Sequence, residues 1–156
     1  MYVEILKTSA GARKAWLSRA RAKHKAKVAS VLSDMSQLVK RKGGFTYSPS
    51  TNHSPKEGMA VSPYPEHTKL VPLKDFSADH IAEYMVAKAA MLKDTANHVG
   101  AWVHEGNVFL DVVIVAKNHA KAVEVCKSKD QIAYFDLKTG KEVIVNKDAK
   151  SGGVVQ

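Results

Sequence analysis

Seven basic side chains within fifteen residues are the part of this sequence best suited to binding a charged partner. Lys and Arg at this density neutralise phosphates and release condensed counterions, which makes binding strong and sensitive to salt. Trp16 and His24 lie among them and could stack on bases or sugars. We therefore predict sequence-nonspecific binding of DNA or RNA. The residues predicted to bind are Arg13, Lys14, Trp16, Arg19, Arg21, Lys23, Lys25 and Lys27.

Two other interpretations of this basic segment stay open. It could dock on an acidic protein surface, or it could be a solvated helix that only confers solubility. Binding to an anionic membrane surface is disfavoured because the segment lacks a broad apolar face. No helix-turn-helix, zinc-finger or aromatic sheet signature is visible, so nothing in the sequence predicts readout of a base sequence.

Asp111 is the second residue that could do chemistry, because it interrupts the apolar run Phe109–Val113 in a strand that should be buried. A buried carboxylate needs partners, and its pKa is perturbed. With Trp102 and His104 on the preceding strand, it could form an acid–base or binding pocket. The favoured alternative is a structural carboxylate that is bonded to Trp102 or to a loop amide, or that lies on a face partly open to solvent.

The remaining reactive residues do not form a recognisable site. The seven histidines lack the spacing of a zinc site, and the one cysteine, Cys126, lies on the apolar face of a predicted short helix as an inert small hydrophobe. No glycine-rich phosphate loop, nucleophile elbow or paired-carboxylate motif occurs. We therefore predict no enzymatic activity, no cofactor and no metal.

The charge distribution predicts how the chain is organised. Residues 1–42 carry eleven basic and two acidic residues, a net charge of +9, which is the whole net charge of the protein. Residues 43–156 are neutral overall. We predict a basic helical arm over residues 1–43, a folded domain over 44–146 and a flexible tail over 147–156.

Residues 9–41 predict one long helix. They contain no proline and are rich in alanine, lysine, arginine and leucine, with Ser9 as N-cap and Gly43-Gly44 as the stop. An apolar stripe in the second half of this helix could dock on the domain or pair two copies in a homodimer. Its residues are Val28, Val31, Leu32, Met35 and Leu38.

The domain reads as alternating strands and helices. Strands are expected at 45–47, 59–61, 69–71, 99–104, 108–116, 132–137 and 142–145, and helices at 78–93 and 119–129. Two pairs of strands read as hairpins, and strands 108–116 and 132–137 could run parallel across the second helix. The prediction is an α+β fold: a long basic N-terminal helix, then a small, mainly antiparallel sheet with two helices on one face.

Localisation follows from composition. A single cysteine cannot form an internal disulfide, and the first six residues do not read as a signal peptide, so we expect synthesis in a reducing, intracellular setting. No run of about 18 apolar residues predicts a membrane span.

Five short segments carry a resemblance: residues 44–49 (GFTYSP), 58–66 (GMAVSPYPE), 100–102 (GAW), 108–112 (VFLDV) and 131–136 (QIAYFD). They resemble a small domain found in actinobacterial phages and mobile elements, over residues 44 to about 145. The resemblance implies a phage or mobile-element accessory protein in the bacterial host cytoplasm, or one packaged in a virion. It implies no catalytic residues, and it makes Trp102 and Asp111 signature positions that hold a hairpin together.

Two functions follow as hypotheses. The first is a non-enzymatic accessory protein that binds nucleic-acid phosphates through its basic helix. The alternative is a protein-binding phage module, either an inhibitor of a host defence complex or a virion component, whose basic helix docks on an acidic protein surface.

Overall fold

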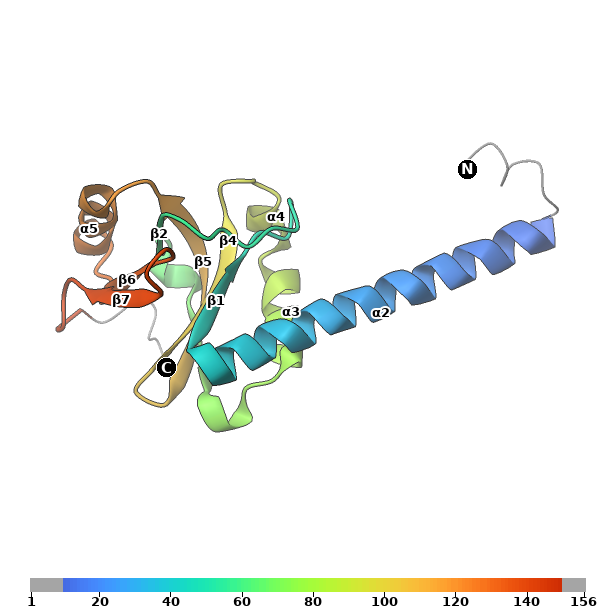
Figure 1. Ribbon diagram of the computed structural model, residues 1–156, viewed down its shortest axis with the longest axis horizontal. Helices are drawn as coiled ribbons and strands as arrows, with labels where there is room; N and C mark the ends of the chain where they lie inside the picture. The colour runs from blue at the N-terminus through green and yellow to red at the C-terminus, as the bar shows by residue number, and fades with distance from the viewer. Residues whose placement is uncertain (1–9, 150–156) are drawn as a thin grey trace.

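The chain has an α+β fold, with a long N-terminal helix followed by a curled, seven-stranded antiparallel sheet and further helices (Figure 1). The computed structural model describes residues 10–149, apart from the side chains of Ala10, Arg13, Trp16 and Leu17. The fold predicted from the sequence is confirmed. The expected N-cap, Ser9, and most of the expected tail lie outside the described residues, and of residues 147–149 Ala149 is buried.

The elements follow one another in a simple order along the chain. The helices are α2 (Ala10–Lys42), α3 (Ala78–Ala87), α4 (Ala89–Leu92) and α5 (His119–Ser128), with the 3-10 turns η1 (Pro65–His67) and η2 (Leu73–Asp75). The strands are β1 (Gly44–Tyr47), β2 (Met59–Val61), β3 (Lys69–Pro72), β4 (His98–His104), β5 (Asn107–Ala116), β6 (Ala133–Asp136) and β7 (Lys141–Ile144).

Helix α2 ends where the sequence predicts. Gly43 adopts a φ of +86°, a left-handed conformation that favours glycine, and its amide still bonds the Val39 carbonyl at 3.0 Å. The basic last turn, Lys40–Lys42, faces the negative end of the helix dipole. Figure 1 shows that only the C-terminal part of α2 lies against the rest of the protein.

The sheet is built around the ten-residue strand β5. The strand order is β1-β4-β5-β2-β6-β7. Strand β2 pairs with the C-terminal end of β5, and β3 pairs with the N-terminal end of β5 on the same edge. Both predicted hairpins form, β4 with β5 and β6 with β7. Strand β2 is antiparallel to both β5 and β6, so those two strands run in the same direction with β2 between them.

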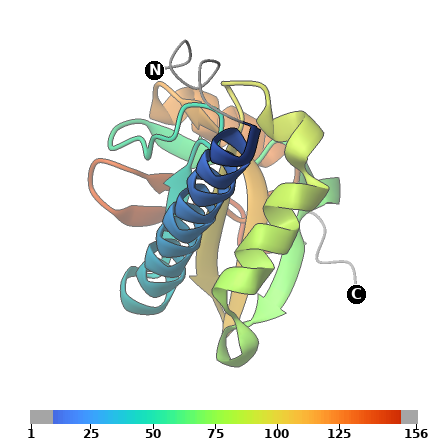
Figure 2. The ribbon, with the colours of Figure 1, turned by 90° about the vertical axis from the view of Figure 1, so that its right-hand side faces the viewer.

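Two apolar clusters lie on one face of the sheet. The larger joins α2 and α3 to β4 and β5 through buried residues such as Val39, Ile81 and Leu110. The smaller lies under α5 and includes Val61 and Cys126. Figure 2, viewed almost along α2, shows α2 and α3 side by side over the sheet.

The helix predicted over 78–93 is two helices, which corrects the sequence analysis. It breaks at Lys88, whose φ and ψ of −105° and 15° are not helical. The break shifts the buried face, so that Tyr84 of α3 is buried and Ala89, the first residue of α4, is exposed. Ser77 caps α3, and the Asn118 side chain caps α5 by accepting from the Lys121 amide at 2.9 Å.

Candidate functional site

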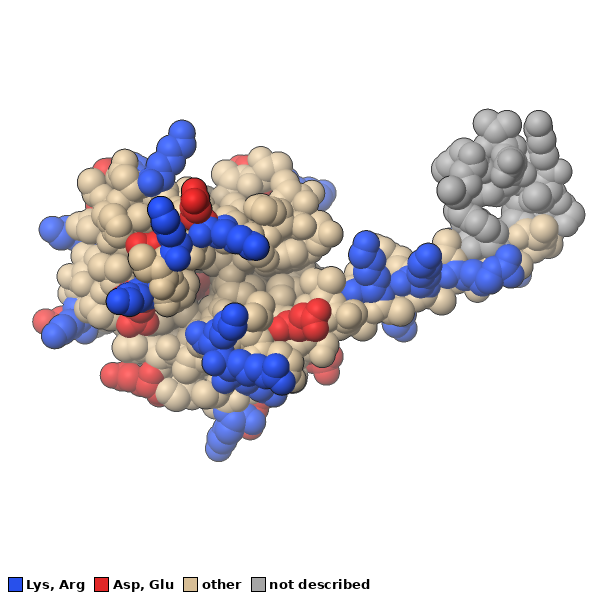
Figure 3. Space-filling view, in the orientation of Figure 1, with Lys and Arg blue, Asp and Glu red and all other residues tan. Residues whose placement is uncertain are grey.

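The outer part of α2 is a solvated basic arm, which we define as Arg13–Lys27. Every described side chain from residue 21 to residue 30 is exposed. Figure 3 shows Lys and Arg side chains along this projecting part of the helix. Of the predicted nucleic-acid contacts, Lys14, Arg19, Arg21, Lys23, Lys25 and Lys27 are described and exposed, while the side chains of Arg13 and Trp16 lie outside the described ones.

The charges on this basic arm repel one another. Arg19, Lys23 and Lys27 follow at intervals of four residues, and so do Arg21 and Lys25, which makes them neighbours on the helix surface. Within the described residues no carboxylate lies within 4.0 Å of any of them. A helix with unpaired like charges at this spacing is stabilised by an anion that binds along it.

The inner part of α2 belongs to the domain core. Met35 and Val39 are buried, and Val31 and Leu32 are partly buried against the same cluster. The division between arm and domain therefore falls inside α2 and not after it. The sequence placed this boundary at residue 43.

Two residues of the predicted apolar stripe are not covered by the domain. Leu38 is 38% exposed and Val28 is 42% exposed. Leu38 lies about 60° around the helix from Met35, away from the domain, and Val39 packs in its place. Nothing in the structure tests pairing of two copies.

A groove of about 360 Å³ lies where the arm leaves the domain. Its lining from α2 includes His24 and Val28, and its opposite wall includes Tyr47 and Met85. The groove is mixed in character, since Lys27 also lines it.

The other candidate site surrounds Asp111, which is buried as predicted, with 4% of its surface exposed. On β5 it lies opposite Gly100 of β4. The Thr68 hydroxyl and the Trp102 side chain hydrogen-bond to its carboxylate. Burial raises the pKa of Asp111 to about 6, although both hydrogen bonds act to lower it.

His104 is not part of this site, which corrects the predicted pocket. The two-residue turn Glu105-Gly106 pairs His104 with Asn107. Asp111 therefore pairs with Gly100, four residues before His104 in β4. The His104 ring instead contacts Trp102 at a centroid distance of 5.2 Å. Asp111 and His104 therefore form no acid–base pair.

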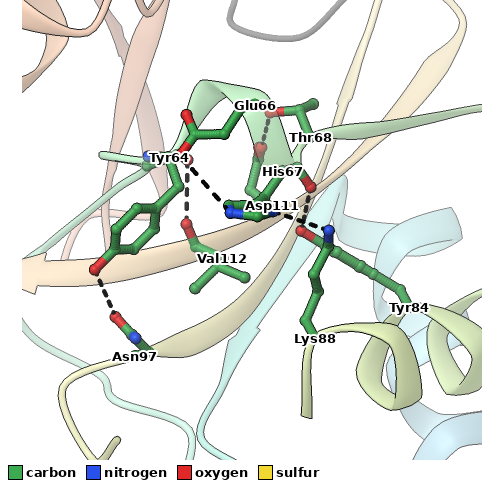
Figure 4. A network of polar contacts seen from close by, with 10 residues as sticks. Tyr64, Glu66, His67, Thr68, Tyr84, Lys88, Asn97, Asp111 and Val112 are labelled. Atoms are coloured by element: carbon green, nitrogen blue, oxygen red, sulfur yellow. Dashed lines mark hydrogen bonds and ion pairs between the residues drawn. The ribbon is translucent and has the colours of Figure 1, made fainter. Parts of the chain in front are cut away.

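A polar network holds Thr68 beside Asp111 (Figure 4). The Tyr84 hydroxyl donates to the His67 carbonyl at 2.6 Å, and the Lys88 ammonium lies 3.0 Å from the His67 imidazole. These contacts fix the backbone directly before Thr68. Tyr84 of α3 and Lys88, between α3 and α4, thereby help to position the Thr68 hydroxyl that bonds Asp111.

Asp111 lines a cavity of about 100 Å³ inside the curl of the sheet. Residues from both ends of the sheet, Gly44 of β1 and Glu142 of β7, line this same cavity. The side chains of β5 that point inward alternate with those that point toward the helices. The sheet thus has a helix-covered outer face and a partly hollow inner face.

Most of this cavity was not predicted from the sequence. Gln131 lines it and is 5% exposed, and its side-chain nitrogen has no hydrogen-bond partner in the described part of the chain. Gln131 lies two residues before β6, and only the curl brings it to the cavity that Asp111 lines. The sequence signal for the cavity was the small size of residues at inward positions of separate strands, such as Gly44, Ala60 and Gly100.

The other reactive residues form no site. Burial raises the pKa of the Cys126 thiol to about 11, so the thiol stays protonated at neutral pH. His119 bonds the Tyr134 hydroxyl at 2.6 Å and lies 3.7 Å from Asp136. Across residues 10–149 no three His, Cys, Asp or Glu side chains gather in a metal-binding arrangement. No helix in that range is long and apolar enough to cross a membrane.

Comparison of the chain with protein-family models, with curated proteins and with solved structures finds no match.

Proposed function

We propose that this protein is a non-enzymatic, nucleic-acid-binding accessory protein that holds DNA or RNA through the phosphates along its basic arm. The observation that carries the proposal is the isolation of the charge. The net charge of +9 lies entirely in residues 1–42, and the described basic side chains of the arm are exposed and unpaired within the described chain.

The size of the arm matches this task. Arg13–Lys27 spans about 21 Å along the helix, the length over which a duplex presents roughly twelve phosphate charges. The basic residues surround the helix and do not form one stripe. This distribution suits a mobile, sequence-independent contact with backbone phosphates better than a fixed position in one groove.

Fluorescence anisotropy with a labelled duplex of about 20 base pairs, and with single strands of DNA and RNA, tests the proposal. We expect the logarithm of the binding constant to fall linearly with the logarithm of salt concentration, with a slope of about −5 for the duplex. The triple variant Arg19→Gln/Lys23→Gln/Lys27→Gln keeps good helix formers and should reduce that slope to about −2 to −3.

The matched control removes the same number of charges from the domain. The triple variant Lys56→Gln/Lys74→Gln/Lys138→Gln changes exposed side chains away from the arm. It should bind like the unmodified protein. Equal weakening by both triple variants, or no binding by the full chain at low salt, would show that the arm is not the binding element.

A second function is favoured by the groove at the base of the arm. The groove places Val28 and Met85 beside Lys27 and His24, so it suits an acidic protein segment that also carries apolar side chains. Under this alternative the protein is a protein-binding phage module, such as an inhibitor of a host defence complex or a virion component. Val28→Glu would then abolish partner binding, whereas it would leave phosphate binding by Arg19 and Lys23 largely in place.

A further inference from the structure

The cavity inside the curled sheet is a partly open space with acidic character in a strongly basic protein. Its lining among the described residues includes two carboxylates, Asp111 and Glu142, and no Lys, Arg or His. Four aromatic residues also contribute to its lining: the rings of Phe45 and Tyr134 pack in the apolar clusters on the helix side, whereas Trp102 and Phe135 lie at inward positions of the sheet. Aromatic faces and carboxylates both attract cations, and the attraction is stronger where water is excluded.

The buried carboxylate lacks a counter-charge in the described chain. Asp111 receives hydrogen bonds from Thr68 and Trp102, which are neutral donors. Burial of an ionised carboxylate is costly unless a positive charge pairs with it. A cation that enters the cavity would supply that charge.

Gln131 is a second and independent sign of a ligand. Its amide nitrogen is buried and has no hydrogen-bond partner within the described residues, and buried polar groups are almost always paired. An amide nitrogen donates, so the missing partner is an acceptor, such as a hydroxyl or carbonyl oxygen. The cavity therefore offers an acceptor for a cation at Asp111 and a donor for an oxygen at Gln131.

Small inward-facing residues keep this space open. Gly100 lies directly opposite Asp111, and because a Cβ on it would come within 2.9 Å of the Val113 side chain, glycine lets Val113 pack against the wall beside Asp111. Ala60 and Ala133 line the facing side of the curl. A void of about 150 Å³ accommodates benzene, so the cavity of about 100 Å³ accommodates four or five non-hydrogen atoms.

We propose that this cavity binds a small organic cation with one oxygen acceptor, an amino alcohol in its simplest form. The ammonium group lies against the Asp111 carboxylate and the Trp102 ring, and the oxygen accepts from the Gln131 amide. Glu142 is exposed and marks the side on which the cavity reaches solvent. The proposal does not depend on nucleic-acid binding by the arm.

Three probes of nearly equal size and different charge test the proposal: ethanolamine, ethylene glycol and glycolate. Trp16→Phe leaves Trp102 as the one tryptophan, because the chain has two, so its fluorescence reports on the cavity. We expect saturable binding of ethanolamine with a Kd of about 0.1–10 mM, typical of so small a ligand. Ethylene glycol and glycolate should cause no saturable change. An equal response to ethylene glycol would overturn the proposal, because the carboxylate would then play no part.

Two variants separate the roles of the polar groups. Asp111→Asn keeps the shape and removes the charge, and it should weaken ethanolamine binding at least tenfold, whereas Asp75→Asn on the exposed turn η2 should not. Gln131→Met keeps the length of the side chain and removes the donor, and it should weaken binding severalfold. Unchanged affinity in Gln131→Met would contradict the assignment even if Asp111→Asn failed to fold.

The pH dependence provides a readout that a purely structural Asp111 would not give. Because the Asp111 pKa is about 6, affinity should fall about tenfold from pH 7 to pH 5 as the carboxylate takes up a proton. The other titratable groups that face it or share its cavity are Tyr84, Tyr134 and Glu142. Burial raises the pKa of both tyrosines, so they stay neutral, and Glu142→Gln removes the remaining carboxylate. Affinity that did not change with pH in Glu142→Gln would contradict the pairing with Asp111.

Discussion

The basic arm and the cavity in the curled sheet carry opposite charges in opposite settings. The arm presents many positive charges to solvent, where each is hydrated, and the partner that we propose for it is therefore large and polyanionic. The cavity holds one fully buried carboxylate, Asp111, where a single charge has a large effect on the free energy of folding and of binding. Changes in the arm should therefore alter binding but not stability, whereas changes in the domain should alter stability first.

Substitutions in the inner part of α2, which follows the arm, should change the free energy of unfolding most. Met35 is 5% exposed in the main core, so Met35→Ala should lower the free energy of unfolding by about 2–4 kcal/mol. Leu38→Ala, one turn along and 38% exposed, should lower it by less than about 1 kcal/mol. Urea denaturation of both variants measures the difference. Similar losses in the two variants would mean that the inner part of α2 does not dock as described.

The buried carboxylate of Asp111 should make the stability of the protein depend on pH. The pKa of Asp111 is raised from 3.8 to about 6 by burial, so the folded state holds its proton more tightly than the unfolded state. The stabilisation from this proton is present below pH 4 and is lost as the pH rises through 6, a change of about 3 kcal/mol. Asp111→Asn should therefore gain about this much stability relative to the unmodified protein between pH 4 and pH 7.

Comparison of the two proteins at each pH isolates Asp111 from the other carboxylates, which titrate in both. A constant difference between them across this range would mean that Asp111 is not desolvated in the folded protein. The sheet would then be open to water at this point.

The smallest effect separates the two parts of α2. Ala22→Gly in the arm should reduce helix content by circular dichroism but leave the midpoint of urea unfolding unchanged, because the arm is not coupled to the core. Gln37→Gly, also exposed but on the inner part, should lower the free energy of unfolding by about 1 kcal/mol. A shift of the midpoint by Ala22→Gly would show that the arm is part of the cooperative unit.

Local patterns allowed much of the fold to be predicted. The end of α2 at Gly43, the cap at Asn118 and the β4–β5 hairpin all depend on residues close together in the chain. The insertion of β2 between β5 and β6 was not predictable, because three residues, Met59–Val61, contain too little pattern to choose a neighbour.

The two candidate sites also differ in how far they could be predicted from residues close together in the chain. The arm could be identified from charge alone, since its contacts with a partner need no tertiary structure. The partners of Asp111 could not, because Thr68 lies 43 residues away in the chain and Gln131 meets the cavity only through the curl of the sheet. The predicted partner His104 failed because a two-residue turn sets the register of the whole hairpin.

A chemical-shift map of the isotopically labelled protein during titration with a short DNA duplex tests directly whether the arm binds phosphate. If the arm alone binds phosphate, backbone amide signals of residues 13–27 should shift, those of the sheet around Asp111 should stay in place, and added salt should reverse the change. Shifts centred on the domain with the arm unaffected would show that the domain, and not the arm, binds DNA.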